Sequence, residues 1–302
     1  MIQSGQFHFS RLVMKEIDNT PVLRMNAPQM ADEETCLFYR DVLTGDDYFH
    51  ILHRTIHHGM RERKATPIVR FADGEYAFYN HDLSCNGLYK QAESVSSINK
   101  AMPLHIAALK TLMKTGKLAP LIFPGNISPK QKRSFPFLRR SKKPSSASTF
   151  LEFLFHHNIE LTGENYIPFY VVYAYLTSED FIRLTHLKKL CILNAEFNSS
   201  SCKLWFEQFS SHPDLSFMEI PAEYVATRWE AIKEGILERI PEDTDICLVG
   251  AGIGALLVCV DVAERFLIPA IDAGHVLNMM NDRVDKSNGA RLYTIRKIKN
   301  AD

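Results

Sequence analysis

The sequence predicts a Rossmann-like α/β fold, with a mostly parallel, doubly wound sheet covered by helices on both faces. Short apolar segments recur along the chain, and amphipathic stretches separate them. Continuous apolar strands that alternate with helices are typical of a parallel sheet buried on both faces. At 302 residues the chain is long enough to bury a sizeable core. We expect a single domain over residues 33–302, preceded by a loosely ordered extension over residues 1–32.

Six segments have the apolar character of buried strands, namely 67–71, 119–123, 190–194, 215–220, 246–250 and 268–272. Helical periodicity is clearest over 97–115, which Gly116 ends, and over 226–240. Pro103 lies inside the first of these helices and predicts a kink or a later helix start. Ligands of such sheets bind at the carboxyl ends of the strands, so the residues that follow each strand are the candidate site residues.

The charge balance and the cysteines exclude several classes of protein. Lys plus Arg and Asp plus Glu both number 35, which argues against nucleic-acid binding by bulk charge. No apolar run is long enough for a signal peptide or a membrane span, so we expect a cytoplasmic protein whose membrane contact, if any, is peripheral. The six cysteines form no Cys-x-x-Cys pair, which favours small buried side chains over zinc ligands or disulfides.

A basic segment rich in serine and proline, at about 130–148, is expected to be a mobile loop. Such a charge run is most often a solvated loop. Its interleaved aromatic residues allow a second interpretation, in which it closes over a nucleotide diphosphate or touches anionic lipid or an acidic acceptor.

Two carboxylates follow the first expected strand, at Asp73 and Glu75, with Gly74 between them. If the chain stays extended there, both side chains share a face and converge. Converging carboxylates suit Mg²⁺ or Mn²⁺, which commonly bind one or two carboxylates together with substrate phosphates. Gly74 would allow close approach of a ligand, and Arg70 would pair with the carboxylates or bind a phosphate. A solvated Asp-Gly turn is the alternative interpretation.

Residues 70–75, Arg-Phe-Ala-Asp-Gly-Glu, resemble the Arg-Phe-Gly-Asp-Gly-Glu signature of the GT-D-type glycosyltransferases. Ala72 stands where that family often has glycine. The resemblance implies a Rossmann-like enzyme that transfers a sugar from a UDP-sugar donor to a glycan or glycoconjugate acceptor. It also implies that Asp73 and Glu75 hold the metal, in the role that Asp-x-Asp plays in many other sugar transferases.

A glycine turn with Gly250, Gly252 and Gly254 follows the fifth expected strand, and Asp272 and His275 follow the sixth. The family ends similarly, with a strand, a glycine turn, a helix and then Asp-x-Gly-His. The resemblance implies that the three glycines approach the donor. His275 is open between a metal ligand, a diphosphate contact, a proton carrier and a structural residue.

A displacement reaction needs a base for the acceptor proton, and Glu223 and Asp272 are the two candidates. Two other functions remain open. The glycine turn also resembles a nicotinamide dinucleotide fingerprint of an oxidoreductase, although its third glycine comes one residue early and only about 50 residues follow Gly250. The other is a non-catalytic binding module on the same fold.

Overall fold

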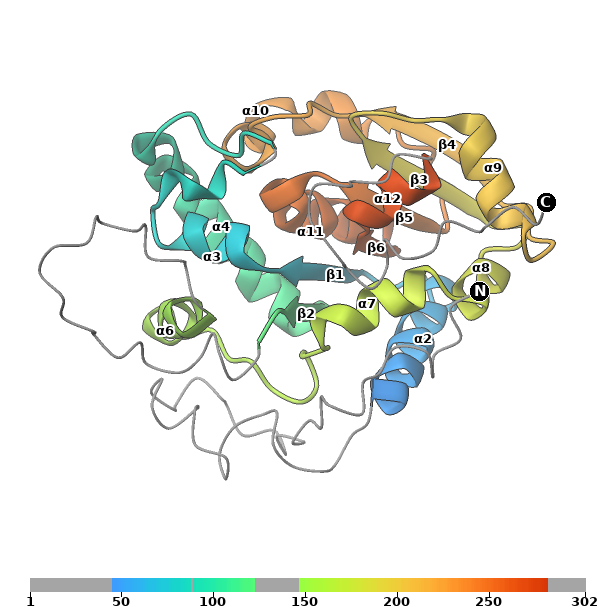
Figure 1. Ribbon diagram of the computed structural model, residues 1–302, viewed down its shortest axis with the longest axis horizontal. Coiled ribbons are helices and arrows are strands. Elements are labelled where there is room, and N and C mark those ends of the chain that lie inside the picture. Colours follow the sequence, from blue (N-terminus) through green and yellow to red (C-terminus); the bar gives the residue numbers. More distant parts are fainter. Residues whose placement is uncertain (1–44, 88, 123–146, 282–302) are drawn as a thin grey trace, which may run out of the picture.

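The computed structural model describes residues 45–87, 89–122 and 147–281 (Figure 1). The expected extension over 1–32 and most of the basic segment at 130–148 lie outside these ranges, and residues 147 and 148 begin helix α6 (Ala147–His156). The division of the chain into an extension and one domain therefore stays a prediction.

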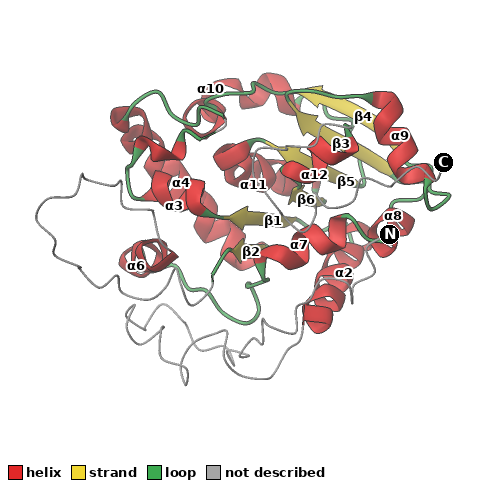
Figure 2. Cartoon of the chain, in the orientation of Figure 1, coloured by secondary structure: helices red, strands yellow, loops and turns green. Residues whose placement is uncertain are grey.

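Six parallel strands form one sheet in the order β2-β1-β6-β5-β3-β4, which confirms the predicted α/β class (Figure 2). The strands are β1 (Thr66–Phe71), β2 (Lys117–Pro120), β3 (Lys189–Asn194), β4 (Asp214–Glu219), β5 (Ile246–Gly250) and β6 (Pro269–Asp272). All six correspond to predicted segments. The edge strand β2 ends earlier than the predicted residue 123, and its last residue, Pro120, pairs with Phe71, where β1 ends.

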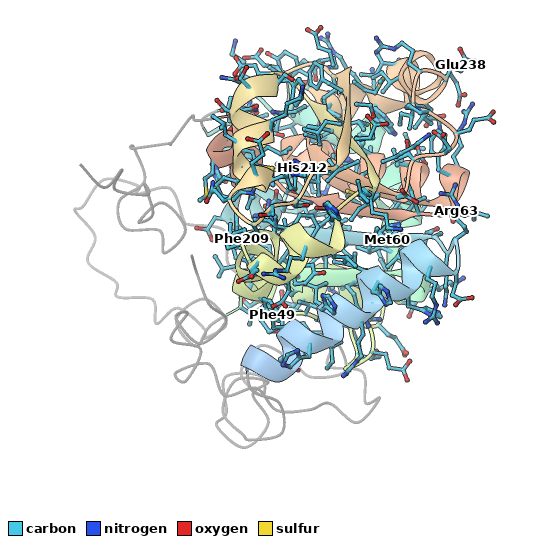
Figure 3. The ribbon with its side chains drawn as sticks, turned by 90° about the vertical axis from the view of Figure 1, so that its right-hand side faces the viewer. Phe49, Met60, Arg63, Phe209, His212 and Glu238 are labelled. Atoms are coloured by element: carbon cyan, nitrogen blue, oxygen red, sulfur yellow. The ribbon has the colours of Figure 1, made fainter. Side chains whose placement is uncertain are left out.

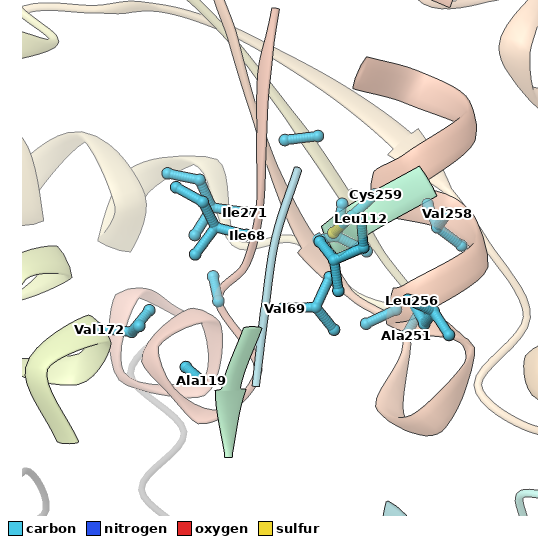
Figure 4. Close-up of a cluster of buried hydrophobic side chains, with 14 of the residues drawn as sticks. Ile68, Val69, Leu112, Ala119, Val172, Ala251, Leu256, Val258, Cys259 and Ile271 are labelled. Atoms are coloured by element: carbon cyan, nitrogen blue, oxygen red, sulfur yellow. The ribbon is translucent and has the colours of Figure 1, made fainter. Parts of the chain in front are cut away.

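Helices cover both faces of the sheet. On one face α4 (Val95–Thr115), α10 (Val225–Leu237) and α11 (Ala255–Phe266) pack on one another and on β1 and β6, while α2 (Gly45–Arg61) and α7 (Phe169–Leu176) pack on the other. Figure 4 shows the alternation that separates the faces: Ile68 lies on the side of Val172 in α7, and Val69 on the side of Leu112 in α4. These buried apolar side chains form the core.

Shorter helices lie in the connections. They are α3 (Asp73–Tyr79), η4 (Leu83–Cys85), α8 (Glu179–Leu184), α9 (Ser199–Glu207), η5 (Gly252–Gly254) and α12 (His275–Met280). Five of these six helices come after the carboxyl end of a strand: α3, α9, η5 and α12 each follow a strand, and η4 follows α3. They therefore lie at the edge of the sheet where ligands of this fold bind.

Helix α4 runs without interruption through Pro103, so the expected later start is wrong. It begins at Ser94, whose hydroxyl accepts the N–H of Ser97. Pro103 and Asn99, whose carbonyl the proline leaves without an intrahelical partner, both lie on the exposed side, where water can take that place. Gly116 ends the helix as predicted, and a Cβ there would lie 1.9 Å from the carbonyl oxygen of Pro67.

The amino edge of the sheet is held by Arg63, just beyond the end of α2 (Figure 3). Its Nη1 donates to the carbonyl of Thr244 at 2.6 Å, and its Nη2 to that of Phe266 at 3.1 Å. These carbonyls precede β5 and β6, so one side chain ties the entry points of two central strands together.

Five cysteines lie in the described ranges, and all of them are buried free thiols, as predicted for Cys191, Cys247 and Cys259. Among the helices of these ranges, none combines the length and the apolar character that a membrane span needs.

His105 joins three helices inside the core. It is fully buried in α4, its Nδ1 lies 2.9 Å from the hydroxyl of Tyr79 in α3, and its Nε2 lies 2.8 Å from the carbonyl of Ala226 in α10. The carbonyl can only accept, so Nε2 carries the proton and Nδ1 accepts from Tyr79. Burial lowers the pKa of His105 to about 4.

We therefore expect stability to fall as the pH drops from 6.5 to 4. In this window the unfolded state binds a proton at residue 105 that the folded state does not, which costs about 3 kcal/mol in total. Urea unfolding at pH 7, 5.5 and 4.5 should show a smaller decline for His105→Gln than for the wild type. The same change at the exposed His156 is the control, and equal declines in all three proteins would contradict the assignment.

Candidate functional site

A buried ion pair joins the ends of β1 and β6. Arg70 and Asp272 are 6% and 5% exposed, and Arg70 Nη2 lies 2.9 Å from Asp272 Oδ1. Arg70 also donates from Nε to the carbonyl of Asp272 at 2.9 Å and from its backbone N–H to Oδ2 at 3.2 Å. Burial alone would lower the pKa of Arg70, but the attraction of the carboxylate outweighs it and raises that pKa. For Asp272 burial has the larger effect and raises the pKa of its carboxyl, although the charge and hydrogen bonds of Arg70 oppose the rise.

The guanidinium also packs against aromatic rings and a glycine. Its carbon lies 4.1 Å from the ring centre of Tyr173 and 5.5 Å from that of Phe169, both in α7. Gly274 has φ +40°, and a Cβ there would lie 2.0 Å from Arg70 Nη2. Within the described part of the chain no group accepts a hydrogen bond from the buried Nη1. Arg70 is thus held from several sides, while the N–H groups of Nη1 have no acceptor among the described residues.

Asp73 and Glu75 lie in the first turn of α3, so the expectation of an extended segment is wrong. The helix begins directly after Ala72, and the third residue of a helix can turn back to cap its start. Glu75 does so, with Oε2 accepting the N–H of Ala72 at 2.8 Å. Asp73 is exposed and Glu75 is half-buried, and among the described residues nothing lies within 4 Å of the position that a Cβ on Gly74 would take. Residues two positions apart on a helix do not share a face, so the convergence expected from an extended segment is lost, and joint binding of one cation by both carboxylates stays a prediction.

The environment of Glu75 raises the pKa of its carboxyl group. Burial raises its pKa to about 7, and the charge of Asp272 adds to this, while the N–H of Ala72 and the Arg70 guanidinium oppose it. Glu75 therefore senses the buried ion pair, although Arg70 forms its ion pair with Asp272 and not with Glu75. A cation bound at Glu75 would displace the carboxyl proton.

The glycine turn after β5 is filled by the protein itself. A Cβ on Gly250 would lie 2.6 Å from Asn194 Oδ1, and one on Gly254 would lie 2.6 Å from Val225 Cγ1. At Gly252, which has φ +54°, the neighbour is the side chain of Gln91, at 2.5 Å. In the structure, the space beside each of these glycines is taken by other residues of the chain. Close approach of a donor at these glycines therefore stays a prediction.

Gln91 takes the place that a phosphate would need in a dinucleotide turn. Its Oε1 accepts the N–H of Ile253 at 3.0 Å, and the side chain is buried. The donor that such turns offer to a pyrophosphate is therefore already used. This contact, with the early third glycine, leaves the oxidoreductase interpretation without structural support.

The segment that carries Gln91, residues 86–94, is tied to the start of α10. The N–H of Tyr224 donates to the carbonyl of Lys90 at 2.9 Å, and Glu93 accepts hydrogen bonds from Thr227 and Arg228. Glu223, half-exposed in the loop after β4, lies 3.9 Å from Lys90 Nζ. The predicted base Glu223 is thus at the carboxyl edge and paired with a lysine.

His275 is the first residue of α12 and follows Gly274 directly. It is half-buried, and its Nδ1 lies 3.4 Å from the amide nitrogen of Asn278. Its backbone lies next to the Arg70–Asp272 pair, as a residue of the candidate site would. Whether it acts as a metal ligand, a phosphate contact or a proton carrier stays a prediction.

The described residues could bind a metal ion only if a substrate or water supplied some of its ligands. Among them, no three His, Cys, Asp or Glu side chains are grouped as a metal cage requires. Asp73 and Glu75 offer two carboxylates, and Mg²⁺ or Mn²⁺ commonly takes its remaining ligands from phosphates and water. Two carboxylates would leave most of the coordination to other ligands, and a metal at Asp73 and Glu75 stays a prediction.

Sequence reasoning missed two participants at this edge. Tyr173 lies in the aromatic segment 166–175, and no motif of the sequence indicates that it packs on Arg70. Gln91 lies in a segment with no motif at all, and its contact with the glycine turn spans 162 residues.

No family model matches the chain, and no curated protein matches it. Two solved structures are similar to it, each covering 76% of this chain and 83% of its own, with a TM-score of 0.45. One, 16% identical, is a selenomethionine-substituted domain of unknown function 1792. The other, 15% identical, is described as showing that this highly conserved domain has a distinct glycosyltransferase fold. At these values the description belongs to those proteins.

We expect Gly274→Ala to lower the free energy of unfolding by at least about 2 kcal/mol, because the new Cβ meets both a positive φ and Arg70. Gly235→Ala is the matched control. Gly235 lies inside α10 with open space around it, so alanine there should stabilise by about 0.5–1 kcal/mol. Urea unfolding measures both, and equal stabilities for the two variants would contradict the placement of Arg70 over Gly274.

Proposed function

We propose that this protein is a metal-dependent glycosyltransferase that moves a sugar from a nucleotide donor of the UDP type to a glycan or glycoconjugate hydroxyl. The observation that carries the proposal is the pair of carboxylates Asp73 and Glu75. Both residues lie in the first turn of α3, after the carboxyl end of β1, and β1 carries Arg70 of the buried Arg70–Asp272 pair.

Asp73 and Glu75 would hold Mn²⁺ or Mg²⁺. The cation, when bound, would neutralise the charge of the departing nucleoside diphosphate. Glu75 would hold the cation in its charged form, and its Oε2 accepts the Ala72 N–H at the start of the helix. Gly74, where an added Cβ would meet none of the described residues within 4 Å, would let the diphosphate approach the backbone.

The structure favours different roles for the two predicted bases. Both carboxylate oxygens of Asp272 accept hydrogen bonds from Arg70, so we assign Asp272 to positioning the turn that carries Asp73. Glu223 is half-exposed and bears a lysine partner that a substrate can displace, so it is the stronger candidate to accept the acceptor's proton. His275, beside the pair, is the second candidate.

The proposal predicts that UDP binds in a metal-dependent manner. Calorimetric titration of UDP, then of UDP-glucose, should show binding with Mn²⁺ that weakens at least tenfold without it. Asp73→Asn and Glu75→Gln should each weaken the Mn²⁺-dependent binding by a similar factor, because each removes one charged ligand.

Glu238→Gln serves as the control, since it removes one exposed carboxylate at the end of α10 (Figure 3). UDP binding that ignored the metal and both site variants would contradict the proposal. Metal-dependent binding with no release of UDP in the presence of any acceptor would favour a non-catalytic binding module.

A further inference from the structure

A second feature of the carboxyl edge is a cavity of about 370 Å³ beyond the end of β3. Its walls come from the loop after β3, the start of α9 and the residue after α12: Glu196, Phe197, Asn198, Ser199, Ser200 and Asn281. This volume lies within the range of small-molecule sites. We call it the β3-edge cavity.

The lining of the β3-edge cavity suits an uncharged, hydroxyl-rich ligand. Its polar side chains are the Glu196 carboxylate, the hydroxyls of Ser199 and Ser200, and the amides of Asn198 and Asn281. The Asn281 amide and the Asn198 Oδ1 already bond within the protein. Phe197 adds an apolar ring, stacked on Phe217 of β4 with the centres 4.9 Å apart. The six lining residues include no lysine or arginine, and Glu196 adds a negative charge, so no side chain of the lining would pair with a phosphate.

The floor of the cavity is preorganised. Asn281 is 6% exposed, its Oδ1 accepts the N–H of Asn198 at 2.8 Å, and its Nδ2 donates to the carbonyl of Glu196 at 3.1 Å. Asn194, at the end of β3, donates to the same carbonyl at 2.9 Å. The loop is therefore fixed from two elements before any ligand arrives, which lowers the entropic cost of binding.

The cavity and the Asp73–Glu75 turn lie on the same edge of one sheet. Three strand spacings separate β1 from β3 in the order β1-β6-β5-β3, or roughly 14 Å. Helix α12 connects the two places: it begins at His275, beside Asp272, and Asn281 follows its last residue. An extended saccharide or a nucleotide sugar bound at one place can reach the other.

We infer that the β3-edge cavity binds the ring of a neutral sugar. This inference rests on the proposed function, in which both substrates carry such a ring: the donor as its nucleotide sugar and the acceptor as its glycan. The hydroxyl groups of the ring pair with the Glu196 carboxylate and the Asn198 amide, and one of its faces rests on the edge of the Phe197 ring.

The test compares two variants of the cavity with one control. Ser200→Trp fills the cavity with a large side chain, and Glu196→Gln keeps its shape but removes the charge. Glu207→Trp places the same bulk at the exposed far end of α9, outside the lining. Saturation-transfer NMR on the full chain then measures binding of UDP with Mn²⁺, of UDP-glucose and UDP-galactose, and of the methyl glycosides of glucose, galactose and N-acetylglucosamine.

We expect both cavity variants to weaken a sugar probe at least tenfold, with UDP binding and the Glu207→Trp control unchanged. An effect on a methyl glycoside identifies the acceptor as the source of the ring, and an effect on a UDP-sugar alone identifies the donor. Unchanged binding of every sugar probe overturns the inference, while metal-dependent UDP binding in the same samples leaves the proposed function standing. A third outcome separates the two claims. If the wild type binds a methyl glycoside but not UDP, and both variants lose the glycoside, the inference about the cavity is supported and the proposed function is refuted. If Ser200→Trp fails to fold, Glu196→Gln decides.

Discussion

The buried ion pair between Arg70 and Asp272 is the interaction on which the candidate site depends. It joins residues 202 positions apart, at the ends of adjacent strands, and three hydrogen bonds hold it. Removing one partner of such a pair strands the other as an uncompensated buried charge, at a cost of about 3–5 kcal/mol. The guanidinium leaves no room for a side chain at Gly274, so the same pair determines how the chain turns from β6 into α12. The start of α3, with Asp73 and Glu75, and the start of α12, with His275, are thereby both anchored next to the Arg70–Asp272 ion pair.

Charge and packing around this pair explain the properties of its neighbours. The carboxylate of Asp272 contributes to the raised pKa of Glu75, which at neutral pH is poised between its charged and neutral forms. Gln91 closes the glycine turn from the other side by taking the N–H of Ile253. Helix α12 runs from the ion pair at Asp272 to the β3-edge cavity at Asn281. In the proposed function, the turn at Asp73 and Glu75 would bind the metal diphosphate and the cavity would bind a sugar ring.

The sequence predicted the fold more completely than the site. Six strands were recognisable because buried parallel strands are continuous apolar runs, and the boundary of β2 was misplaced because it depends on where its partner β1 ends. The positions of Asp73, Asp272 and His275 at strand ends were also predictable. The contacts that these residues make were not predictable from the sequence. Whether Arg70 pairs with Glu75 or with Asp272 depends on strand order, and the helical turn at Asp73 depends on a backbone cap. The filling of Gly252 by Gln91 has no local signal, because the two residues meet only in the folded chain.

The most direct test of the account is a crystal structure of the protein grown with UDP and Mn²⁺, with the cation located by its anomalous scattering. We predict one manganese peak bound by the carboxylates of Asp73 and Glu75 and by the diphosphate, with the Arg70–Asp272 pair intact behind it. A diphosphate bound in the glycine turn in place of Gln91, or a manganese ion bound away from Asp73 and Glu75, would contradict the central claim.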